Sequence, residues 1–238
     1  MRLQCAQSIS RERTRQTDGQ NKIKIHPLRK IKSCGCPLDL RGLILSGFLI
    51  LFCGSGDLAS ALGLLAVLWY NLVYTPLKQK TAFAAVPGAL VGAIPPVLGW
   101  VAGAGSILDP RIWGVALLFF VWQVPHFLLL ALDFSEDYEK AGLPSVTQLF
   151  STQQIKRIVF IWLLSTGVAG LSFSSSGLIH SHFVSLFLFA ATSWLIWNAI
   201  GFLRFNSQGT VPRMAFTKLN IYALFVLFLL SVDRLLSP

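Results

Sequence analysis

Residues 112–132 read IWGVALLFFVWQVPHFLLLAL, and this stretch decides the fold class. It supplies the roughly 20 apolar residues that a membrane-spanning helix needs, and His126 is its only ionisable side chain. Similar apolar segments recur along the chain, so the sequence predicts an all-α, polytopic transmembrane helical bundle with about seven spans. The other predicted segments are 42–55, 58–75, 82–104, 157–174, 182–203 and 216–235.

The composition excludes a soluble globular protein. Of the 238 residues, 54% are hydrophobic and only 13% are charged, whereas about 25% are charged in an average soluble domain. The mean hydropathy is +0.63. We therefore predict two parts, a basic arm at residues 1–41 and a transmembrane domain at residues 42–238. No nucleic-acid-binding fold follows the arm, so we expect it to contact anionic lipid headgroups rather than nucleic acid.

The distribution of basic residues predicts the orientation in a cell inner membrane. With the N-terminus on the cytoplasmic side, 18 of the 20 Lys and Arg residues lie in or beside inner loops. Only Arg111 and Arg234 then lie outside. Basic loops mark the cytoplasmic side of a membrane, so the bias favours this topology, with the C-terminus outside. The turn sequence Gly54-Ser-Gly-Asp57 predicts that the first two spans form a helical hairpin.

An acidic cluster follows the span that ends at Leu132. Four of the ten acidic residues fall between 133 and 139. Asp133 and Asp137 are four residues apart and would share one face if the helix continued. Such a carboxylate pair could bind Mg²⁺ against a phosphate-bearing substrate. The alternative is a solvated acidic helix end, although negative charge is disfavoured at a helix C-terminus.

Two basic residues occupy the segment Tyr74-Thr-Pro-Leu-Lys78-Gln-Lys80, which we predict to be a short inner loop. Their ammonium groups could neutralise a diphosphate. The alternative is the ordinary excess of positive charge in inner loops.

Prolines interrupt two of the predicted spans. His126 follows Pro125, and an ionisable residue inside a span usually faces a cavity or a partner helix. It could contact an acceptor ring or a metal, or it could make a hydrogen bond between helices. In Gly92-Ala-Ile-Pro95-Pro96, proline opens the helix, so this segment could line a cavity or simply pack.

Five segments in this order resemble motifs of the UbiA-type intramembrane prenyltransferases, and most of all their haem-farnesylating branch. The resemblance covers residues from about 70 to the end of the chain. The segments are Tyr74–Lys80, Gly92–Trp100, Trp122–Phe127, Asp137–Pro144 and Phe216–Tyr222.

The resemblance implies a helical fold around a central cavity that opens to lipid. It also implies the transfer of a farnesyl group from farnesyl diphosphate, bound through Mg²⁺, to haem B, which yields haem O. Partners would be the lipid bilayer, the two substrates and proteins of oxidase assembly. The implied metal ligands are Asp133 and Asp137, with Lys78 and Lys80 as further catalytic residues and with Tyr74, His126, Tyr138 and Lys140 as substrate-binding residues.

The N-terminal region departs from the family pattern. The resemblance implies nine helices with an Asp-rich motif at the end of the second, but seven spans are predicted here and no apolar segment precedes residue 42. Asp18 is the only acidic residue that could supply part of that metal site. We therefore expect either a truncated chain or a degenerate homologue without activity, such as a scaffold that binds haem or lipid. A second alternative is a prenyltransferase that acts on an aromatic quinone precursor.

Overall fold

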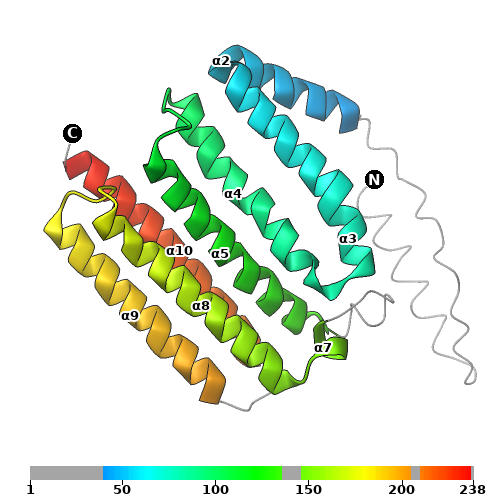
Figure 1. Ribbon diagram of the computed structural model, residues 1–238, viewed down its shortest axis with the longest axis vertical. Coiled ribbons are helices and arrows are strands. Elements are labelled where there is room, and N and C mark those ends of the chain that lie inside the picture. Colours follow the sequence, from blue (N-terminus) through cyan, green and yellow to red (C-terminus); the bar gives the residue numbers. More distant parts are fainter. Residues whose placement is uncertain (1–39, 136–145, 205–209, 237–238) are drawn as a thin grey trace, which may run out of the picture. The chain divides into compact units, whose positions relative to one another are not determined.

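The computed structural model describes residues 40–135, 146–204 and 210–236. The chain divides into two compact units, Met1–Leu40 and Arg41–Pro238, and the candidate spans of the described residues lie in the second. All regular elements in the described ranges are helical, which confirms the predicted all-α fold (Figure 1). They are α2 (Leu40–Leu68), the π-helix η1 (Trp69–Tyr74), α3 (Thr75–Lys80), the 3₁₀ turn η2 (Ala82–Ala84), α4 (Ala85–Ala102), α5 (Pro110–Asp133), α7 (Val146–Leu149), α8 (Thr152–Ser175), α9 (His182–Arg204) and α10 (Thr210–Leu236).

Six helical segments in the described ranges are long and apolar enough to cross a membrane. The first of them, Gly42–Lys80, consists of two arms, because Gly56 has φ 82° and ψ −178° and breaks the helical geometry inside α2. The arms fold back on each other (Figure 1), and Leu51 of one lies against Gly63 of the other. The predicted hairpin is therefore confirmed, and the seven predicted segments correspond to six spans of which the first is bent.

Helix α5 is the centre of the bundle. It packs against α4, α8 and α10, and α9 packs against both α8 and α10 (Figure 1). Val124 and Leu129 of α5 are fully buried in the main core. Large apolar side chains such as Ile50, Phe183 and Trp197 remain mostly exposed on the outside of the helices, as expected for a surface that faces lipid rather than water.

Proline does not interrupt α4 or α5, contrary to the expectation of broken spans: α4 continues through Pro95 and Pro96, and α5 through Pro125. Pro125 has no N–H to bond the carbonyl four residues earlier, at Val121. The hydroxyl of Thr166 on α8 lies 3.3 Å from that carbonyl oxygen and 2.8 Å from the oxygen of Trp162. A neighbouring helix thus supplies the donor that the proline removes.

Polar contacts join α9 and α10 at three levels. Lys218 Nζ donates to Asn198 Oδ1 at 2.6 Å, and Tyr222 Oη lies 3.1 Å from Thr192 Oγ1. At the far end, the fully buried carboxylate of Asp233 accepts from the backbone N–H groups of residues 180 and 181, with shortest distances of 3.0 and 2.9 Å. Buried polar groups that find partners in this way fix how two helices are rotated against each other.

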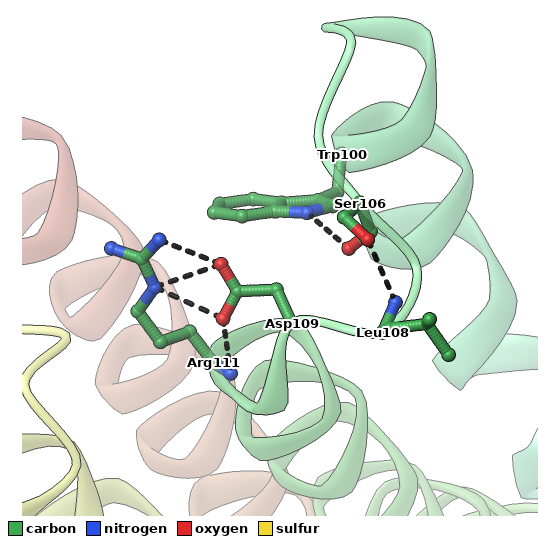
Figure 2. A network of polar contacts seen from close by, with 5 residues as sticks. All are labelled: Trp100, Ser106, Leu108, Asp109 and Arg111. Atoms are coloured by element: carbon green, nitrogen blue, oxygen red, sulfur yellow. Dashed lines mark hydrogen bonds and ion pairs between the residues drawn. The ribbon is translucent and has the colours of Figure 1, made fainter.

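A second polar network closes the loop between α4 and α5 (Figure 2). Asp109 forms an ion pair with Arg111 at 2.6 Å and accepts from the Arg111 backbone N–H at 2.9 Å, so it caps α5. The Arg111 guanidinium lies 5.7 Å from the ring of Trp100, whose Nε1 donates to the Ser106 carbonyl at 3.0 Å. The hydrogen bonds from Arg111 lower the pKa of the Asp109 carboxyl.

Candidate functional site

Most of the basic residues described lie at one end of the bundle, which we call the basic end. Helices α3 and α5 finish there, and α8 and α10 begin there (Figure 1). The opposite end carries only Arg111 and Arg234 among the described basic side chains, as the counting of charges predicted. The basic end carries Lys78, Lys80, Lys156, Arg157, Arg204, Arg213 and Lys218.

A π-helix carries the chain into the basic end. In η1, the backbone N–H and the side-chain hydroxyl of Thr75 both donate to the Tyr70 carbonyl, the latter at 2.9 Å. Pro76 has no N–H for the carbonyl of Leu72, which explains why the regular ladder is lost here. The loop predicted at Tyr74–Lys80 is wrong in its local structure, because Thr75–Lys80 form the helical turn α3. Short π-helical segments are rare and often occur at functional sites.

Tyr74 joins its own motif segment to the two helices that carry the next two segments, α4 and α5. Its ring stacks on Phe127 of α5, with centroids 5.9 Å apart and an interplanar angle of 18°. It also lies against Gly88 of α4, where a Cβ would come within 2.6 Å of the ring. Lys78 Nζ lies 5.7 Å from the Tyr74 centroid, within range of a cation–π interaction. Lys78 and Lys80 are both exposed, as expected for groups that meet a soluble diphosphate.

His126 makes the hydrogen bond between helices that was one of its predicted alternatives. Its Nδ1 lies 3.0 Å from Oδ1 of Asn220 on α10. Its ring also contacts Trp122 at 4.8 Å and Phe216 at 4.6 Å between centroids. Nε2 has no hydrogen-bond partner among the described residues. The other alternative, contact with an acceptor or a metal, therefore remains open for that atom.

Three residues of this cluster were not predicted as site residues: Gln123, Phe216 and Asn220. The side chain of Gln123 lies against Gly92 of α4, where a Cβ would come within 2.8 Å of its Oε1. Phe216 and Asn220 are four residues apart, so they share a face of α10. A polar Asn inside an apolar span was a signal that the sequence offered, because such residues usually bond to a neighbouring helix.

Four of the five motif segments therefore meet around α5. The Tyr74 segment reaches it through Phe127, the Gly92 segment through Gln123 and the Phe216 segment through His126. Tyr74, Phe127, His126 and Phe216 form a row of ring contacts that crosses η1, α5 and α10. We call these four residues the aromatic row.

The acidic cluster begins at the same end. Asp133 is the last residue of α5 and is exposed. Phe134 has φ −105° and ψ 20°, so the regular geometry of α5 ends at Asp133. The distance from His126 to Asp133 along the helix is about 10 Å, at 1.5 Å per residue. The predictions for Asp18, Asp137, Tyr138 and Lys140 fall outside the described residues.

The described residues alone do not form a magnesium site. Within the described ranges, no group of three His, Cys, Asp or Glu side chains is placed to hold a metal ion. Asp133 is a single carboxylate, whereas Mg²⁺ in phosphate-binding sites takes one or two carboxylates together with substrate oxygens. The predicted role of Asp133 and Asp137 in metal binding thus remains a prediction.

Comparison with known proteins gives the family. The UbiA prenyltransferase family matches residues 41–229. A protein of Geobacter sulfurreducens is 46% identical over 102 residues, which is 43% of this chain and 37% of that protein. One of Oleidesulfovibrio alaskensis is 36% identical over 191 residues (79% and 65%), and one of Myxococcus xanthus is 32% identical over 181 residues (76% and 61%).

All three relatives bear the name protoheme IX farnesyltransferase. The chain spans between about a third and two thirds of the lengths of these relatives. No solved structure matches it. The family match covers most of the chain and includes all six candidate spans in whole or in part. The chain therefore belongs to the UbiA prenyltransferase family and is a multi-pass membrane protein.

Proposed function

We propose that the protein transfers a farnesyl group from farnesyl diphosphate to haem B and so forms haem O. The observation that carries this proposal is the stacking of Tyr74 on Phe127, which brings Tyr74 and Lys78 next to the region around His126. A cation for the diphosphate and an aromatic surface for an apolar acceptor then lie side by side at the basic end. The names of the three relatives support the choice of donor and acceptor.

The electrostatics of the basic end suit the departure of a diphosphate. In the reaction, the bond between the farnesyl C1 and the diphosphate oxygen breaks, and pyrophosphate leaves with the electron pair. The ammonium of Lys78 would stabilise the charge that grows on the leaving group. Lys80, two residues further on, would add a second positive charge at longer range.

The aromatic row suits the cationic and apolar partners of the same step. A vinyl carbon of haem B would attack the farnesyl C1, and water would add its oxygen to the neighbouring vinyl carbon and release a proton. Ring faces attract a cation, so Tyr74 and Phe127 can stabilise the allylic carbocation. The flat apolar macrocycle of haem can pack on the rings of Phe216 and Trp122.

We further propose that the basic end faces the cytoplasm across an inner membrane, since soluble farnesyl diphosphate would enter there. Mg²⁺ would supply charge neutralisation for the diphosphate when bound, with Asp133 as one ligand and with Asp137 and Asp18 as the proposed others. Tyr138 and Lys140 remain proposed substrate-binding residues. Proteins of oxidase assembly remain proposed partners.

An acceptor competition tests this function. The purified protein in lipid nanodiscs would receive farnesyl diphosphate, Mg²⁺ and an equimolar mixture of haem B and an aromatic quinone-precursor acid. We expect mass spectrometry to find haem O and no prenylated acid. Prenylated acid as the product would replace the acceptor in our proposal, and no product at all would favour an inactive homologue.

A further inference from the structure

We propose that Asn220 is a positioning residue that holds His126 with its proton on Nδ1, so that a lone pair on Nε2 is offered to the acceptor substrate. The identity of that substrate rests on the proposed function. The tautomer of His126 does not rest on the proposed function, because it follows from the contact between α5 and α10.

The hydrogen bond determines the tautomer. A neutral imidazole carries one N–H and one lone pair, and the bond made by one nitrogen decides the state of the other. Oδ1 of Asn220 is an acceptor without a proton, and it lies 3.0 Å from Nδ1. Nδ1 must then be the donor, which leaves Nε2 unprotonated. Among the described residues, no other side chain forms a hydrogen bond with His126.

Packing prevents Asn220 from turning away from His126. Its neighbours Leu219 and Tyr222 are 0% and 1% exposed, and Tyr222 is tied to Thr192 on α9. One turn earlier, Phe216 packs on the His126 ring at 4.6 Å. The rotation of α10 is thus fixed from two sides, and the amide of Asn220 is presented to α5.

Trp122 provides an independent sign that a ligand completes this region. Its Nε1–H is buried and has no acceptor among the residues that the structure describes, and its ring lies 4.8 Å from that of His126. A buried donor without a partner destabilises the folded protein, because it has lost its hydrogen bond to water and gained none in return. A bound molecule with a carboxylate or carbonyl oxygen would satisfy this donor, while its electron-poor centre, such as the haem iron, would receive the Nε2 lone pair.

Solid-state NMR of the full chain in nanodiscs tests the tautomer directly. Histidine would carry nitrogen isotope labels, and the His126 signals would be assigned by their loss in His126→Gln. We expect a protonated Nδ1 and an unprotonated Nε2. In Asn220→Leu, which has a similar volume and no acceptor, we expect a large population of the opposite tautomer. In Asn220→Asp, which keeps the acceptor, the proton should stay on Nδ1. A proton on Nε2 in the unaltered protein, or an unchanged tautomer in Asn220→Leu, would overturn the proposal.

Haem titration, followed by the visible absorption band, tests the consequence. Loss of a residue that orients a ligating histidine typically weakens binding by about 10–100-fold. We expect a loss in this range for Asn220→Leu, recovery in Asn220→Asp and no change in Ser193→Ala, a control on α9 whose exposed hydroxyl bonds to the Phe189 carbonyl of its own helix. Equal haem affinity in all variants would contradict the positioning role. A tautomer change without any haem binding, even by the unaltered protein, would instead count against the proposed function.

Discussion

The hydroxyl oxygen of Thr166 lies 3.3 Å from the carbonyl oxygen of Val121, the group that Pro125 leaves without a helical donor. We predict that Thr166→Val destabilises the bundle by about 1 kcal/mol, because a buried carbonyl loses its partner. Thr166→Ser keeps the hydroxyl and should cost less. Unfolding in a titration with a denaturing detergent measures the difference.

A double-mutant cycle isolates this contact. Pro125→Ala restores the helical N–H to Val121, so the cost of Thr166→Val should become smaller in that background. An equal cost in both backgrounds would show that Thr166 acts only through its bond to its own helix at Trp162.

Gly170 is required because the Tyr222 hydroxyl occupies the place of a Cβ. We predict that Gly170→Ala lowers the free energy of unfolding by about 1–3 kcal/mol through overpacking. Gly201→Ala on α9 is the matched control, since nothing lies within 4 Å of its Cβ position. Tyr222→Phe removes the colliding oxygen and should rescue much of the loss. Absence of rescue would mean that Gly170 matters for another reason.

Asp233 holds the start of α9 through the N–H groups of His180 and Ser181. Asp233→Ala would leave both donors without this acceptor. We therefore predict that hydrogen exchange at these two amides becomes about tenfold faster, which corresponds to a loss of about 1.4 kcal/mol of local stability. Asp57→Ala is the control, because Asp57 is an exposed acid in the Gly54–Asp57 turn. Unchanged exchange in Asp233→Ala would contradict the assigned role.

The pair of Asp109 and Arg111 predicts a small dependence of stability on pH. The pKa of Asp109 is lowered in the folded protein by its hydrogen bonds with Arg111. The ionised Asp109 carboxylate therefore stabilises the folded protein fully at pH values above its unfolded pKa of 3.8. This stabilisation is lost as the pH falls through the lower pKa that the carboxyl has in the folded protein. Melting temperatures of the unaltered protein and of Asp109→Asn should converge over this acid range. A difference that stays constant below pH 3.8 would contradict the pairing.

Lys78 should contribute to the binding of farnesyl diphosphate. A hydrogen bond to a charged group is worth about 1.5–3 kcal/mol, so we predict that Lys78→Gln raises the apparent KM for this substrate by about tenfold or more. The value of kcat should fall as well, because the ammonium also stabilises the charge that grows on the leaving diphosphate. Arg234→Gln, which removes a positive charge at the opposite end, is the control. Equal effects of the two substitutions would point to net charge rather than to a local contact.

The sequence predicted the spans well, because each is set by a local apolar run. The span predicted at 182–203 is α9, His182–Arg204. The start of α8 was predicted five residues late, since Ser151 and Gln154 form a capping box that extends the helix into polar sequence. The π-helix before Pro76 was missed as well, because apolar periodicity does not distinguish it from an α-helix.

The sequence predicted individual residues of the site, but it did not predict which of them lie against one another. Tyr74 and His126 were each selected for their own chemistry, whereas their link through Phe127 depends on how two distant helices pack. Asn220 was missed for the same reason, since its role exists only across the contact between α5 and α10. Long-range packing of this kind leaves no local signal beyond a polar residue in an apolar span.

The central claim is that this chain transfers a farnesyl group to haem B at the basic end. The most direct test is the amount of haem O formed per protein molecule in nanodiscs with excess farnesyl diphosphate, haem B and Mg²⁺. We predict repeated turnover that is lost when haem B is omitted. Haem B that is recovered unchanged, from protein that melts cooperatively and retains its helical content, would contradict the claim.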